Sequence, residues 1–170
     1  MNEALGWNIA LLGNLGRSFL EKPQLEILDS VKADEWYPVK ILTDLLETVK
    51  RRAGKEQLVA CGRGIFYALK DRLEREGVMT PQAMLESILR EYLGCHRGES
   101  VGNWWIRSIE KGRAMVEDAT MHDCALGEGI LYGAVRASGG RDVKVVHAQC
   151  KERGDDVCIN EVTWKEIAPT

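Results

Sequence analysis

The two parts of this chain carry different hydrophobic patterns, and this division constrains the fold more than any other feature. Up to about residue 95, apolar residues recur at three- and four-residue spacing, which is typical of amphipathic helices. From residue 104 onward, strand-forming residues alternate with turns around one further helical segment. Because helices and strands occur in separate runs, the sequence predicts an α+β fold with N-terminal helices packed on a C-terminal antiparallel sheet with one inserted helix.

Proline and glycine mark the boundaries of the expected helices. Three helices are predicted at 38–54, 58–77 and 80–94, since proline suits a first turn and glycine often follows a last one. A short helix is expected around residues 12–19. The first part of the chain is therefore predicted to be mainly helical.

The second part is predicted to be rich in strands. Strands are expected at 104–106 and 114–116, a glycine-rich helix at 124–135 and a closing hairpin at 142–165. We expect one domain over residues 1–170, with a helical part at 1–97 and a sheet-rich part at 98–170.

Composition narrows the class of protein. The 170 residues are 45% hydrophobic, which is enough for a core, and the net charge of −3 is spread over charges of both signs. This distribution gives no electrostatic footprint for direct nucleic-acid binding. No segment approaches the apolar length that spans a bilayer, and the start lacks the basic region of a signal peptide. We therefore expect a cytoplasmic protein.

Three of the five cysteines and one of the three histidines fall within 35 residues, spaced C-x22-H-x2-C-x7-C. Thiolate and imidazole are preferred ligands of tetrahedral zinc, and a shell filled by protein argues for a structural ion. The candidate ligands are Cys124, His147, Cys150 and Cys158.

Two other interpretations of the cysteines remain open. They can be small buried hydrophobic residues beside an incidental histidine, or disulfide partners. His147 and Cys150 would face opposite sides of a regular strand, so the chain must bend between them or His147 is not a ligand. Cys95-His96 and His122-Asp123 are further weak metal candidates.

The second part of the chain resembles the 4-vinyl reductase domain family. The resemblance lies in the run 127–133 (GEGILYG), in Cys150 and in the run 154–158 (GDDVC), with a looser match at 35–38 (EWYP). It implies a small-molecule, "hydrocarbon"-binding domain with a TRAPP/NO-signalling-like fold. It also implies kinship with the subunits of the TRAPP trafficking complex, which pair as dimers, and with the sensor domain of phenol-responsive activators.

The resemblance implies a metal set and ligand contacts. The activators' sensors hold zinc through three cysteines and an acidic residue, and these positions match Cys124, Cys150 and Cys158, with His147 in place of the acid. Their phenol-binding histidine has no clear counterpart here, because its position falls near Arg75. Their tryptophan matches Trp104 or Trp105, so the resemblance implies an apolar pocket that lacks the phenol-binding histidine.

Four residues are candidates for ligand binding. Aromatic side chains suit a mostly apolar cavity, although core packing explains any single tryptophan equally well. Glycines in a helix cost stability, so the close approach of a neighbouring backbone or of a ligand should offset them. The candidates are Trp104, Trp105, Gly129 and Tyr132.

These observations together predict a ligand-binding sensor or regulatory module, of a kind used in transcription regulation, with structural zinc and a small apolar ligand. A homodimer and a separate regulatory or signalling partner are expected. The alternatives are a dimeric adaptor resembling TRAPP subunits and an accessory protein of tetrapyrrole reduction. No catalytic arrangement is legible in the sequence, so no enzyme activity is expected.

Overall fold

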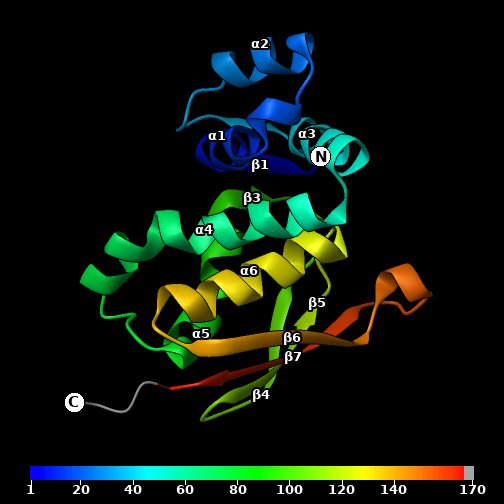
Figure 1. Cartoon of the computed structure of the whole chain (residues 1–170). Helices are drawn as coiled ribbons and strands as arrows, with labels where there is room; N and C mark the ends of the chain where they lie inside the picture. The colour runs from blue at the N-terminus through cyan, green and yellow to red at the C-terminus, as the bar shows by residue number, and fades with distance from the viewer. Residues whose placement is uncertain (167–170) are drawn as a thin grey trace.

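The computed structural model describes residues 1–166 and confirms the predicted α+β class. Helices α1 to α3 form one end of the molecule, and α4, α5 and α6 pack between this end and the sheet of β4 to β7 (Figure 1). The helices are α1 (Gly6–Leu15), α2 (Lys22–Ser30), α3 (Val39–Ala53), α4 (Lys55–Arg75), α5 (Pro81–Cys95) and α6 (Cys124–Ala137).

Two antiparallel sheets are present in the described residues. The larger has the order β4-β5-β7-β6, built from β4 (Trp104–Glu110), β5 (Arg113–Asp118), β6 (Arg141–Gln149) and β7 (Cys158–Lys165). The smaller has the order β2-β1-β3, built from β1 (Glu3–Leu5), β2 (Trp36–Pro38) and β3 (His96–Arg97). The smaller sheet joins the start of the chain to the end of α5, a connection that the sequence did not predict.

Local chemistry explains where the long helices begin. The Thr80 side chain accepts a hydrogen bond from the backbone N–H of Ala83, and Pro81 takes the first helical position. Asp123 caps α6 in the same way by accepting from the N–H of Ala125. Gly54, at φ 85°, allows the sharp junction between α3 and α4.

Helices α4 and α6 approach each other at backbone distance. A Cβ atom on Gly62 would lie 2.3 Å from the carbonyl oxygen of Leu126, and one on Gly129 would lie 2.1 Å from that of Val59. Gly133 meets the Arg63 carbonyl oxygen in the same way, at 2.5 Å. The glycine run of α6 therefore allows close helix packing, and this packing offsets the loss of helix stability that glycine causes.

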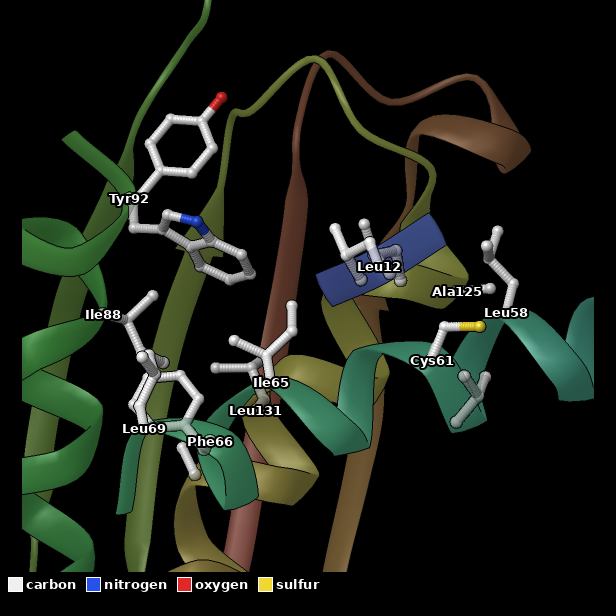
Figure 2. Packing of buried hydrophobic residues seen from close by; sticks show 14 of the residues in the cluster. Leu12, Leu58, Cys61, Ile65, Phe66, Leu69, Ile88, Tyr92, Ala125 and Leu131 are labelled. Atoms are coloured by element: carbon white, nitrogen blue, oxygen red, sulfur yellow. The ribbon is translucent and has the colours of Figure 1, made fainter. Parts of the chain in front are cut away.

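The core lies where these helices meet the larger sheet. Ile65, Phe66 and Leu69 of α4 lie opposite Ile88 and Tyr92 of α5 (Figure 2). The buried face of β5 and β7 presents apolar side chains to the same core, among them Val116, Val162 and Trp164. Within the described residues, no helix combines the length and the apolar character that crossing a membrane requires.

Candidate functional site

An apolar cavity lies among α1, α4, α5, α6 and the start of β4. Its volume is about 40 Å³, which is room for a few water molecules. Its walls are formed largely by apolar side chains, including Leu12, Phe66, Leu69, Ile88, Trp104 and Leu126. Six of the lining residues are labelled in Figure 2: Leu12, Ile65, Phe66, Leu69, Ile88 and Tyr92. A cavity of this character suits an apolar guest that enters by displacing wall side chains.

Two buried histidines form the polar part of the wall. His96 follows the last residue of α5, and His122 lies in the segment between β5 and α6. Their Nε2 atoms are 2.9 Å apart, and their rings meet edge to face. Tyr92 stacks on His96 with ring centroids 4.2 Å apart, and its hydroxyl donates to the carbonyl oxygen of Val101. The tyrosine thereby fixes the orientation of the first imidazole.

The contacts of His96 determine the tautomers of the pair. Its Nδ1 lies 3.2 Å from the backbone carbonyl oxygen of Tyr92, which can only accept a hydrogen bond. The thiol of Cys95, 3.3 Å from Nδ1, is itself directed at this carbonyl, so the arrangement that serves all three groups has the proton on Nδ1. The Nε2 of His96 then accepts a hydrogen bond from the Nε2–H of His122. The Nδ1 of His122 is then a buried acceptor, and it has no partner among the described residues.

Burial keeps both imidazoles neutral. Burial lowers the pKa of His96 to about 4, although the hydrogen bond to the Tyr92 carbonyl acts to raise it. It lowers the pKa of His122 to about 3, and the neighbouring His96 and Lys151 act in the same direction. At neutral pH the pair is a neutral hydrogen-bonded unit, not a buried charge.

A second unpartnered polar group lines the same cavity. Asn8 of α1 lines the cavity and is only 3% exposed, and its Nδ2 has no hydrogen-bond partner among the described residues. The cavity therefore offers a buried amide donor in Asn8 and a buried imidazole acceptor in His122. Because unpaired buried polar atoms are costly, a ligand group that pairs with them would gain affinity.

The structure separates the four predicted ligand residues. Trp104 is buried and lines the cavity, whereas the adjacent Trp105 is 51% exposed and faces a surface depression. Gly129 packs on the α4 backbone. Tyr132 lies under the guanidinium of Arg63, 4.0 Å from the ring centroid, and does not line the cavity. Only Trp104 is thus placed beside the cavity.

Three of the four predicted metal ligands come together. The sulfur atoms of Cys124, Cys150 and Cys158 lie within 4.8 Å of one another, and all three residues are buried. Cys124 opens α6, while the other two flank the tip of the β6–β7 hairpin. His147 stays outside this cluster, because its Nε2 lies 3.3 Å from a carboxylate oxygen of Glu128 on α6.

The thiols of this cluster differ in acidity. Burial raises the pKa of Cys158 to about 12, which favours the neutral thiol. Burial acts in the same direction on Cys150, but hydrogen bonds from the backbone N–H groups of Glu152 and Arg153 and from the two neighbouring thiols outweigh it. They hold the pKa of Cys150 below its usual value. Cys150 is therefore the more acidic of these two thiols.

Among solved structures, the fold is that of the H-NOX domains, which are haem NO/O2-binding sensors. An H-NOX protein from Shewanella oneidensis in its Fe(II) state superposes with a TM-score of 0.74 at 15% identity, covering 96% of this chain and 97% of its own. The unliganded Fe(II) H-NOX protein from K. algicida gives 0.72 at 11% identity over 98% and 99% of the two chains.

A third similar structure is an oxygen-binding H-NOX domain related to soluble guanylate cyclases. It has a TM-score of 0.67 at 12% identity over 97% of this chain and 96% of that one. No family model matches the sequence, and no match is found among curated proteins. At these identities the likeness establishes the shared fold, so the ligand has to be argued from the residues of this chain.

Two predictions are corrected by these comparisons. The resemblance to the 4-vinyl reductase family is wrong as an assignment, because the structural neighbours are H-NOX domains and no family model supports the motif match. The motif consists of common residue types, and two of its glycines, Gly129 and Gly133, are explained by the packing of α6 on α4. The NO-signalling-like fold that it implied is confirmed.

The predicted zinc cofactor is also wrong. The similar proteins are described in Fe(II), Fe(II)NO and oxygen-bound states, which point to haem iron as the metal of this fold. The prediction rested on cysteine spacing, and one of its four ligands, His147, pairs with Glu128 instead.

The residues of this chain do not fit a haem either. The cavity of about 40 Å³ is far below the roughly 300 Å³ at which pockets for cofactor-sized ligands begin. Its described lining contains no lysine or arginine for the haem carboxylates. No chemical step is therefore assigned to a haem in this chain.

Proposed function

We propose that this chain is a sensor module for a small, uncharged and largely apolar molecule that binds in the interior cavity. The supporting observation is an apolar wall that carries two buried polar atoms without partners, Asn8 Nδ2 and His122 Nδ1. A ligand hydroxyl can accept from an amide or donate to an imidazole nitrogen, so its chemistry suits either group. A few placed polar groups in an apolar pocket are typical of small-molecule sites.

The small volume of the cavity supports a role for the protein in sensing a ligand and not in storing one. A dry cavity of about 150 Å³ is known to accept benzene, so a ring-sized guest needs more space than the 40 Å³ present here. The guest must bind an expanded conformation, and it therefore shifts the population towards that conformation. This coupling of occupancy to shape is what a sensor requires.

The segment that carries His122 offers a route from the cavity to the surface. His122 lines the cavity and also two surface depressions, which it shares with Met121 and Asp123. The ammonium group of Lys151 donates to the carbonyl oxygens of Thr120 and His122, which holds this segment in place. We propose that displacement of His122 by the ligand alters this surface, where a separate signalling protein reads it.

A matched pair of probes tests the proposed site. Benzyl alcohol and toluene share the ring, but only the alcohol carries a hydroxyl group. Titration of the full chain followed by ¹H–¹⁵N NMR should show shifts at Trp104 and around residues 120–122, with tighter binding of the alcohol. In a His122→Leu variant this preference should shrink, while an exposed-site control, Tyr67→Phe, should keep it. Shifts confined to the surface, or no binding of either probe, would refute the proposal.

The three-cysteine cluster is a second candidate site. Three thiols with sulfur atoms within 4.8 Å suit a soft cation, and we propose that the cluster takes one with thiolate ligands. Cadmium(II) is a suitable probe, because its thiolate complexes absorb in the ultraviolet. A Cys158→Ser variant should lose this band, while Cys61→Ser, at a separate buried cysteine, should retain it. A band that both variants share would exclude the cluster.

A further inference from the structure

We infer that this chain is a haem-independent member of the H-NOX fold, whose interior rejects the anionic macrocycle and accepts only uncharged guests. The exclusion of haem follows from the cavity itself, while the acceptance of a neutral guest rests on the proposed sensor function. Three independent features of the wall carry the inference: its charge, its histidines and its packing.

The charge of the wall opposes a haem. A haem carries two carboxylates, which need cationic or hydrogen-bonding partners when they leave water. Within the described lining the one charged residue is Glu91, an acid with a 12% exposed side chain. It offers a haem carboxylate no counter-charge, because it is itself an acid that is paired with Arg72 and Arg90.

The two arginines beside Glu91 already form ion pairs with acidic side chains. Arg72 bonds to the carboxylates of both Glu91 and Glu76, and Arg90 bonds to the same two acids. Two arginines and two glutamates therefore form a closed, balanced network between α4 and α5. Recruiting either arginine to a haem carboxylate would remove one of the two partners of Glu91 at the cavity margin and unbalance the network.

The histidines are arranged to bind each other. A histidine that ligates iron must present a free ring nitrogen. Both nitrogens of His96 are occupied, Nδ1 by the Tyr92 carbonyl and Nε2 by His122. The remaining free nitrogen, Nδ1 of His122, shares the cavity lining with the free amide of Asn8, and an acceptor together with a donor suits a polar organic group better than a metal.

The packing around the cavity distinguishes a single-ring guest from a haem by the volume that each requires. The side chains of Leu12, Phe66 and Leu126 are at most 2% exposed, and they fill the space beside the cavity. A single-ring guest requires roughly a fourfold expansion of the 40 Å³ present, whereas a cofactor-sized pocket requires about an eightfold one or more. The second expansion would dismantle the contact between α4 and α5 shown in Figure 2.

Titration of the full chain with hemin tests the exclusion directly. We expect no stoichiometric complex, no sharpened Soret band and, after reduction under carbon monoxide, no defined difference spectrum. Hemin dimethyl ester, which lacks the carboxylate charges, should associate at least as well as hemin. Weak association that is unchanged in a His96→Gln and a His122→Gln variant is surface adsorption, and it supports the inference.

The result that would overturn the inference is a one-to-one hemin complex with a carbon monoxide spectrum in the unmodified chain. This readout needs no variant, so misfolding of a histidine variant cannot obscure it. The benzyl alcohol titration tests the proposed function separately. If neither hemin nor benzyl alcohol binds, the exclusion of haem stands and the sensor proposal fails; if hemin alone binds, both fail.

Discussion

His96 and His122 face each other through their Nε2 atoms at 2.9 Å, although 26 residues separate them in the chain. The carbonyl oxygen of Tyr92 holds the proton of the first ring on Nδ1, so the second ring must donate through Nε2. The free Nδ1 of His122 on the cavity wall is a direct consequence of this contact.

Removing both members of the histidine pair should cost less than the sum of the two single removals. His96→Leu leaves the Nε2–H of His122 buried without an acceptor, and His122→Leu leaves the Nε2 of His96 without a donor. Each single change should lower the free energy of unfolding by about 1–3 kcal/mol. The double variant should lose less than the sum of the two, as urea denaturation of all four proteins would measure. Strict additivity would contradict the hydrogen bond.

The stability of the protein should depend on pH through His96. Its pKa is about 4 in the folded state and about 6.5 in the unfolded chain, so the unfolded chain binds more protons between these values. The free energy of unfolding should therefore rise by roughly 3 kcal/mol for one such group between about pH 4 and about pH 6.5. Above about pH 6.5 it should level off.

Urea denaturation between pH 5 and pH 7 measures this slope while most carboxylates remain ionised. The His96→Leu/His122→Leu double variant is the control, because it lacks both titrating rings. Its stability should change much less over the same range. Equal slopes in the two proteins would show that the buried imidazoles do not titrate as described.

The contact between α4 and α6 should tolerate no side chain at Gly129. A Cβ atom there would lie 2.1 Å from the Val59 carbonyl oxygen, so Gly129→Ala must push the two helices apart. We expect a loss of about 1–3 kcal/mol or more, as for other overpacked cores. The matched control is Gly94→Ala on α5, where nothing lies within 4 Å of the new atom.

The control change should stabilise the protein by about 0.5–1 kcal/mol, because alanine is the better helix former. Thermal denaturation of both variants gives the comparison. If Gly129→Ala were as well tolerated as Gly94→Ala, the glycines of α6 would need another explanation, such as contact with a ligand.

Much of the fold was predictable because periodicity and caps are local. The helices at 38–54, 58–77 and 80–94 correspond to α3, α4 and α5, and the hairpin at 142–165 corresponds to β6 and β7. Helix α2 was missed because Pro23 resembles a break in the chain, whereas it lies in the first turn beside a capping box. The strands β1 to β3 are at most three residues long and carry no detectable alternation.

The site was less predictable because its parts meet only in three dimensions. Cysteine spacing around a hairpin was enough to bring Cys124, Cys150 and Cys158 together. It could not show that His147 turns to Glu128 on α6. Nor could the sequence link His96 to His122, since their contact depends on where α5 ends relative to the segment before α6.

The proposal that the interior cavity binds a ligand is tested most directly by enlarging the cavity and measuring its affinity for benzyl alcohol. Ile88→Ala removes a buried wall residue, while Leu93→Ala removes a half-exposed one from the same helix. Isothermal titration with benzyl alcohol should show tighter binding to Ile88→Ala, because less expansion of the wall is then needed, and unchanged binding to Leu93→Ala. Equal affinities for the two variants and the unmodified chain would place the ligand elsewhere and contradict the account.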